Sequence, residues 1–260
     1  MIEIEGVSKS YGPARVVDGV SLTIAKGGLT AIIGPNGAGK STLLSIMARL
    51  LPMDGGRVAV DGLDVTTTRG DVLARRLAVL RQDNHMTARL TVRDLVAFGR
   101  YPHSKGRPTA EDARHIDEAI DWLGLRGLEE RFLDELSGGQ RQRAFVAMVL
   151  SQDTDYLLLD EPLNSLDMKH ATEMMALLRR TADAFGKTVV VVLHDINFAS
   201  CYADRVVALR EGRLAFDGTP QELMRRDVLA AIYDMDIEIH TIAGHLFGAY
   251  HLSGKNGSGA

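Results

Sequence analysis

Apolar and polar residues alternate with a period of two near the start of this chain. The alternation runs through residues 2–11 (IEIEGVSKSY) and 16–28 (VVDGVSLTIAKGG), and it returns at residues 56–65 (GRVAVDGLDV). Alternation of this kind is typical of strands with one buried face. We therefore expect an antiparallel β layer formed by the N-terminal part of the chain.

A second pattern consists of short runs that are almost wholly apolar and end in polar residues. It occurs at residues 29–34 (LTAIIG), 77–82 (LAVLRQ), 156–162 (YLLLDEP) and 188–195 (TVVVVLHD). Such runs indicate parallel strands buried on both faces, and ligands bind at the ends of such strands. Helices are expected after the first run, at residues 40–51, and after the third, at residues 167–186. In the second helix the helically spaced apolar residues are predicted to pack in the core: Ala171, Met174, Met175, Leu178, Ala182 and Phe185.

The region between the second and third runs has helical rather than strand patterns. Helices are predicted within residues 91–100, 110–124 and 137–152. Further on, the chain predicts a hairpin around Glu211–Gly212, a helix over 220–234 and a second hairpin over 237–252. We expect one α/β domain over residues 1–260. Its parts are a β layer and mainly parallel core at 1–85 and 153–253, an inserted helical subdomain at 86–152, and a flexible tail at 254–260.

Composition limits the functions open to the chain. Its 260 residues are 45% hydrophobic and carry a formal net charge of −4, which argues against a nucleic-acid partner. A single cysteine, Cys201, excludes an intramolecular disulfide, and a buried thiol is expected there rather than a zinc ligand or nucleophile. No signal peptide or membrane-spanning run is found, so any role at a membrane must act through a partner.

Residues 34–41 (GPNGAGKS) carry the strongest chemical signal. They fit G-x-x-x-x-G-K-[ST] and stand between a predicted strand and a predicted helix, as a phosphate-binding loop requires. Backbone N–H groups of such a loop surround phosphates, Lys40 adds a cation, and Ser41 can bind Mg²⁺. At the end of the third apolar run, Asp160 is placed to hold the Mg²⁺ and Glu161 to act as a base, which predicts phosphoryl transfer.

A second anion site is predicted at residues 136–143 (LSGGQRQR). Ser137 and Gln140 have the spacing of a capping box, so a helix should begin here. Two glycines in its first turn destabilise the helix, which suggests that a group approaches its backbone closely. A helix N-terminus favours an anion. The chain thus has two predicted phosphate sites about a hundred residues apart.

These three motifs together resemble the Walker A, signature and Walker B motifs of ABC ATPases, which have a P-loop NTPase core. The resemblance spans nearly the whole chain and implies that Tyr11 stacks on adenine, Gln82 senses Mg²⁺ and a partner, and His194 contacts the γ-phosphate. Alternatives stay open for Tyr11, as a packed aromatic, and for Asp167, which resembles the D-loop but is also placed as a helix N-cap. Catalytic roles are expected for Glu161, His194 and Gln82, and Mg²⁺ contacts for Ser41, Gln82 and Asp160. The expected ATP-binding residues are Tyr11, Gly34, Pro35, Asn36, Gly37, Ala38, Gly39, Lys40, Ser41, Thr42, Ser137, Gly138, Gly139, Gln140 and Asp167.

The same resemblance implies a homodimer, or a pairing with a related chain, because ABC ATPases bind ATP between the P-loop of one copy and the signature of the other.

Three classes fit a P-loop: a transporter subunit, a soluble ABC ATPase and a kinase. The signature argues against a kinase. The missing coiled-coil or zinc insertion argues against a repair ATPase, and the missing tandem ATPase domains argue against a translation factor. Residues 82–107 resemble the permease-docking segment of ferric siderophore importers, with haem and cobalamin importers as alternatives. This resemblance implies that the chain binds a membrane permease at the cytoplasmic face of the membrane. It also implies an indirect connection to a substrate-binding protein. The apolar residues Leu90, Val92, Leu95, Val96 and Phe98 could instead pack the helical subdomain.

Overall fold

The computed structural model describes residues 1–82 and 88–250, and the strands of this part of the chain form three sheets. The predicted N-terminal β layer is confirmed as an antiparallel sheet in the order β2-β1-β4-β5. Its strands are β1 (Ile2–Tyr11), β2 (Ala14–Ile24), β4 (Gly55–Val60) and β5 (Leu63–Asp64). The predicted tail at 254–260 lies outside the described residues.

The second sheet has six strands in the order β10-β9-β3-β8-β7-β6, and the four apolar runs form four adjacent parallel strands in it, with β6 at the edge. These strands are β3 (Gly28–Ile33), β6 (Leu77–Leu80), β7 (Tyr156–Asp160) and β8 (Thr188–Val192). The predicted hairpin around Glu211–Gly212 extends it with β9 (Arg205–Arg210) and β10 (Arg213–Gly218). The C-terminal hairpin, β11 (Glu238–Ile242) with β12 (His245–Ala249), is a separate sheet.

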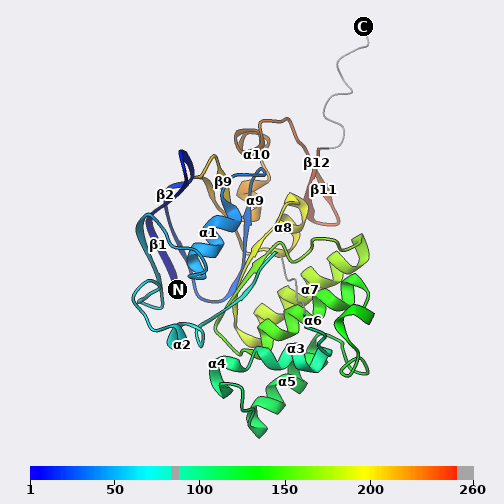
Figure 1. The fold of residues 1–260 in the computed structure, drawn as a ribbon. Helices are drawn as coiled ribbons and strands as arrows, with labels where there is room; N and C mark the ends of the chain where they lie inside the picture. Colours follow the sequence, from blue (N-terminus) through cyan, green and yellow to red (C-terminus); the bar gives the residue numbers. More distant parts are fainter. Residues whose placement is uncertain (83–87, 251–260) are drawn as a thin grey trace.

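Strands β3, β6, β7 and β8 are buried on both faces, which explains why their sequences do not alternate. In β3, Ile32 packs in one core with helix α1 (Lys40–Met47) and the antiparallel sheet, whereas Ala31 and Ile33 pack in the other core with the remaining helices. Figure 1 shows α1 between the two sheets and the group α3 to α7 at the lower end of the molecule. The carboxyl ends of β3, β7 and β8 are thereby left to form a site.

The inserted helices connect β6 to β7, which are neighbours in the sheet. They are α3 (Val92–Phe98), α4 (Tyr101–Ser104), α5 (Ala110–Trp122), the short η1 (Leu133–Glu135) and α6 (Gly138–Ser151); a single turn, α2 (Gly70–Leu73), precedes β6. A buried ion pair holds this group together: Arg100 Nε donates to Asp112 Oδ1 at 2.8 Å, and both side chains are 4% exposed. Hydrogen bonds from the Thr109 backbone and from Arg100 lower the pKa of Asp112 to about 2, although burial opposes this.

The core helix α7 (Met168–Phe185) carries the predicted apolar stripe, and all but one of its six residues are buried. Phe185 is predicted to lie in the core but is 49% exposed; its ring packs in a tilted arrangement against Trp122 of α5, with ring centroids 4.7 Å apart and an angle of 58° between the planes. Trp122 Nε1 also donates to Thr181 Oγ1 at 2.9 Å. The inserted helices are thus fastened to the core by an aromatic and a polar contact.

One predicted helix, over residues 220–234, is wrong in its continuity. It is divided into α9 (Pro220–Leu223) and α10 (Arg226–Tyr233), with Arg225 in an extended conformation between them. The break lets Leu223 and Leu229 both reach the core, which a straight helix over this pattern would not do. Helix α8 (Ile196–Tyr202) follows β8, and no helix within the two described ranges has the length and apolar character to cross a bilayer.

Candidate functional site

A tight loop, residues 34–39, connects β3 to α1. Gly34 has φ +136°, and a Cβ built on it would lie 2.0 Å from the carbonyl oxygen of Leu209; Gly39 has φ +96°, and its Cβ would lie 2.4 Å from the carbonyl oxygen of Val16. Only glycine fits either position. The loop therefore closes around the start of α1, which has no side-chain cap, so its first N–H groups are free to bind an anion.

Lys40, the first residue of α1, is 5% exposed. Its ammonium donates to the carbonyl oxygens of Gly34 at 2.8 Å and Pro35 at 3.0 Å, so it lies inside the curve of the loop. Burial lowers the pKa of Lys40, whereas the charges of Glu161 and Asp160 raise it. A positive charge held within a ring of backbone dipoles is suited to a phosphate group.

Ser41 and Asp160 bring two oxygen atoms together at the other end of the loop. Ser41 Oγ, on α1, donates to Asp160 Oδ1, at the end of β7, at 2.8 Å. Burial raises the pKa of Asp160, and the hydrogen bond from Ser41 opposes that rise. A hydroxyl and a carboxylate are the hard oxygen ligands that Mg²⁺ prefers, so this pair fits the ion.

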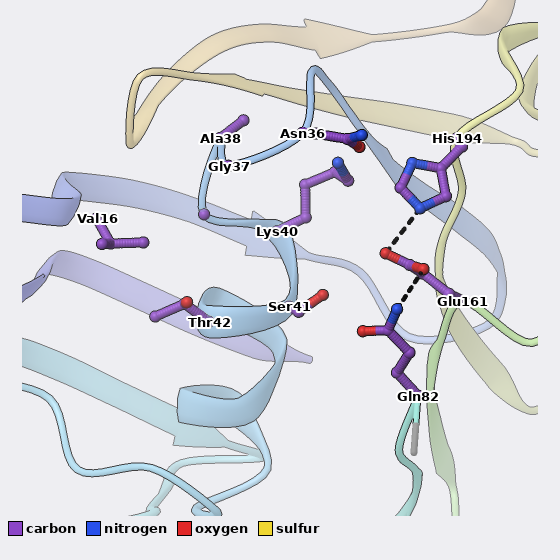
Figure 2. A pocket seen from close by; sticks show the side chains of 11 residues that line it. Val16, Asn36, Gly37, Ala38, Lys40, Ser41, Thr42, Gln82, Glu161 and His194 are labelled. Atoms are coloured by element: carbon purple, nitrogen blue, oxygen red, sulfur yellow. Dashed lines mark hydrogen bonds and ion pairs between the residues drawn. The ribbon is translucent and has the colours of Figure 1, made fainter. Parts of the chain in front are cut away.

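Glu161 lies at the mouth of the same space, with its carboxylate held from three sides. His194 Nε2 lies 2.7 Å from Oε1, Gln82 Nε2 donates to Oε2 at 2.9 Å, and Asn164 Nδ2 donates to Oε2 at 2.6 Å. Figure 2 shows the first two contacts, with Lys40 and Ser41 facing Glu161 across the cavity. The Glu161 backbone has φ +49°, which lies in the left-handed region. The turn after β7 thus directs this side chain into the cavity, and the backbone at Glu161 is strained.

These groups line one cavity of about 370 Å³. Besides Val16, the lining residues are all predicted site residues: Asn36, Gly37, Ala38, Gly39, Lys40, Ser41, Thr42, Gln82, Glu161 and His194. Gly34, Pro35 and Asp160 contact this lining from behind through Lys40 and Ser41. The two motifs and the two strand-end residues thus form a single site.

Several predicted residues lie apart from the cavity. Tyr11, at the end of β1, is 51% exposed and is not among the lining residues. Ser137, Gly138, Gly139 and Gln140 start α6, and the predicted capping box is confirmed by bonds of 3.1 Å and 3.3 Å between Ser137 and Gln140. Asp167 caps α7, accepting from the His170 backbone at 2.8 Å. The second predicted anion site therefore does not complete the cavity of its own chain.

Two features of the site were missed in the sequence. Asn164 binds Glu161 directly, and its position three residues after Glu161 in a turn is the signal that could have indicated it. Val16 lines the cavity from β2, and nothing in the local sequence marks it. The expected burial of Cys201 is only partly correct: the side chain is half-buried, and this burial raises the pKa of its thiol.

The segment predicted to dock a permease is divided between core and surface. Residues 83–87 lie outside the described part of the chain. Val92, Leu95 and Val96 are fully buried, so they pack the helical subdomain as the alternative interpretation expected. Phe98 and Tyr101 are exposed by 51% and 61% and are left on the surface.

Comparison with known proteins agrees with this geometry. The family model described as "ABC transporter" matches residues 17–164. The chain is similar to the petrobactin import ATP-binding protein YclP of Bacillus subtilis (strain 168), with 52% identity over 96% of this chain and 99% of that protein. It is also similar to the iron(3+)-hydroxamate import ATP-binding protein FhuC of the same organism, with 38% identity over 92% and 90%. Among solved structures, an ATP-binding cassette captured as a dimer in a post-hydrolysis state with ADP and Pi has a TM-score of 0.75 and 27% identity, covering 85% of this chain and 99% of that one.

Proposed function

This chain belongs to the ABC transporter family, and from that premise we propose that it is the ATP-hydrolysing subunit of an importer for ferric siderophores. The observation that carries the proposal is the cavity in which a phosphate-binding loop, a buried lysine and Glu161 meet. The relatives named for petrobactin and iron(3+)-hydroxamate import, each covering nine-tenths or more of this chain, support the cargo class.

The proposal gives chemical roles to residues of the cavity, to Asp160 behind it and to Tyr11 outside it. The N–H groups of residues 34–39 and the ammonium of Lys40 bind and orient the phosphates of ATP. Ser41, Asp160 and Gln82 hold Mg²⁺, which supplies charge neutralisation between the phosphates when it is bound. Tyr11 stacks on adenine.

Glu161 is the base. Its carboxylate accepts a proton from the attacking water, and His194, which bonds to that carboxylate, fixes its direction and contacts the γ-phosphate. Gln82 contacts Glu161 from the segment that follows β6 and leads to the inserted helices. A movement of those helices can therefore change the position of the base.

The ATP site is completed by a second copy of the chain. We propose that Ser137 to Gln140 and Asp167 of one copy contact the nucleotide bound by the other, because these residues lie apart from their own cavity and the α6 N-terminus can bind an anion. The dimeric cassette with ADP and Pi supports this arrangement.

The domain organisation proposed is a single ATPase domain with its helical subdomain at residues 86–152. Residues 82–107, which lead into this subdomain and form its first part, dock a permease. The permease holds the chain at the cytoplasmic face of the membrane and connects it indirectly to a substrate-binding protein. The exposed side chains of Phe98 and Tyr101 are available for this contact.

The test uses a strain from which the gene for this chain is deleted. Its growth under iron limitation on single purified chelates is measured together with uptake of each labelled chelate. We expect loss of uptake of at least one ferric siderophore, restored by the wild-type gene and not by a gene carrying Glu161→Gln. Normal uptake of every ferric siderophore combined with lost haem or cobalamin uptake would show that the alternative cargo is correct. Unchanged transport of all of them would contradict an importer role.

A further inference from the structure

The second glycine of the signature, Gly139, is in contact with a side chain of its own chain. It is buried in the first turn of α6, and a Cβ built on it would lie 2.8 Å from Cδ2 and 3.0 Å from Cγ of His170 in α7. The imidazole ring therefore occupies the space that a side chain at position 139 would need. The group predicted to approach this glycine closely is a histidine, in addition to any anion at the helix end.

The same imidazole is held on its other side by Asp167. Asp167 Oδ1 accepts from the backbone N–H of His170 at 2.8 Å and lies 2.8 Å from its Nδ1. Because a carboxylate only accepts, Nδ1 carries a proton in this contact. The hydrogen bonds from the His170 backbone and ring lower the pKa of Asp167, so the acceptor is ionised. The ring thus has a fixed direction as well as a fixed place.

This contact joins two segments that are far apart in the sequence. Gly139 begins α6 in the inserted helices, whereas Asp167 and His170 begin α7 in the core. The neighbouring Gly138 also faces this turn, since a Cβ on it would lie 3.8 Å from the carbonyl oxygen of Ser165. Under the proposed function, both segments act on nucleotide bound by the second copy.

We propose that His170 is a positioning residue that holds the signature turn and the Asp167 turn of one chain in a single fixed arrangement, so that both meet the partner's nucleotide together. This proposal rests on the proposed function. Its consequence is that His170 affects the closing of the ATP-bound dimer, while the binding of ATP to the cavity of the same chain does not depend on it.

The test is a double-mutant cycle of Gly139→Ala and His170→Ala, made in full-length protein that also carries Glu161→Gln to accumulate the ATP-bound dimer. Gly139→Ala alone should weaken ATP-driven dimerisation roughly ten- to a hundredfold, because its methyl group meets the ring and overpacking of this kind is costly. Adding His170→Ala should recover most of that loss, although His170→Ala alone weakens dimerisation. The ATP dissociation constant of each monomer should stay within about threefold of the starting protein.

Gly138→Ala is the matched control. Its Cβ has room beside Ser165, so its effect on dimerisation should be the same in the presence and absence of His170→Ala. A Gly139→Ala defect that His170→Ala does not relieve would overturn the proposal, since the defect would then belong to the nucleotide contact alone. Failure of the starting protein to bind ATP or to dimerise would instead contradict the proposed function.

A second pair of variants covers the case in which Gly139→Ala does not fold. His170→Phe keeps a ring against Gly139 but loses the bond to Asp167, whereas His170→Ala loses both. We expect both to weaken dimerisation with unchanged ATP affinity of the monomer, and His170→Ala to do so more strongly. Dimerisation within twofold of the starting protein for both variants would overturn the proposal.

Discussion

Replacing Glu161 with glutamine should abolish hydrolysis and leave ATP binding intact. The amide can keep the contacts seen around the carboxylate, because its oxygen can accept from Gln82 and Asn164 while its NH₂ donates to the Nε2 of a neutral His194. The loop and Lys40 are not touched, so the ATP dissociation constant should change by less than about threefold, under 1 kcal/mol. The substitution removes the negative charge and, with it, the ability to accept a proton. A general base contributes about 10²–10⁴-fold, which corresponds to about 2.7–5.5 kcal/mol of barrier.

The assay compares ATP turnover of the permease complex with equilibrium binding of ATP to the isolated chain. Glu111→Gln is the matched control, since Glu111 is exposed in the first turn of α5 and its variant should behave as wild type in both measurements. Turnover by Glu161→Gln within a few fold of wild type would refute the assignment of the base. Loss of ATP binding would refute the argument that this side chain is separate from the phosphate contacts.

Three further outcomes are expected. Asp112→Ala leaves Arg100 buried without its partner and should lower the free energy of unfolding by about 3–5 kcal/mol in urea titrations followed by circular dichroism, against about 0.5 kcal/mol or less for the exposed Glu118→Ala. The folded-state pKa of Asp112 is about 2, below the usual 3.8, so its ionisation stabilises the fold fully above about pH 4. The difference in unfolding free energy between wild type and Asp112→Asn should therefore shrink as the pH falls towards 2. A difference that grows with acid would contradict this reasoning. In tethered dimers, Ser137→Arg and Lys40→Ala placed on opposite chains should damage one ATP site, and placed on the same chain should damage both, measured as ATP occupancy of each site; the reverse pattern would show that the signature serves its own chain.

The strands of the two larger sheets were predictable because the pattern of apolar residues along a strand shows whether one or both of its faces are buried. Alternation marks the antiparallel layer, which has one buried face, and continuous apolar runs mark the strands that are covered on both faces. The break near Arg225 was not predictable, because residues 220–234 keep a helical pattern on both sides of it and the reason for the break is the position of the core. Phe185 fits its stripe equally well, yet it lies near the end of α7 and is half exposed, with Trp122 of another helix against its ring.

In the site, sequence reasoning identified residues that belong to contiguous motifs and missed contacts made across the fold. Residues 34–41 are recognisable from their glycine spacing, since the close approach of the loop to Leu209 and Val16 allows no other residue at two positions. The contact of His170 with Gly139 depends on the packing of two helices from different parts of the chain, and no local pattern encodes it. The glycine itself was informative, because it indicated a close neighbour without identifying it.

The single tryptophan of the chain provides a spectroscopic consequence. Trp122 is the only residue of its kind, and it reaches from the inserted helices to Thr181 and Phe185 of α7, with the guanidinium carbon of Arg180 5.0 Å from its ring centroid. Indole emission is quenched or shifted when a nearby hydrogen bond or cation moves, so the unlabelled protein reports on this one contact. A change in emission on adding ATP would report, in real time and without a dye, a movement of the inserted helices relative to α7.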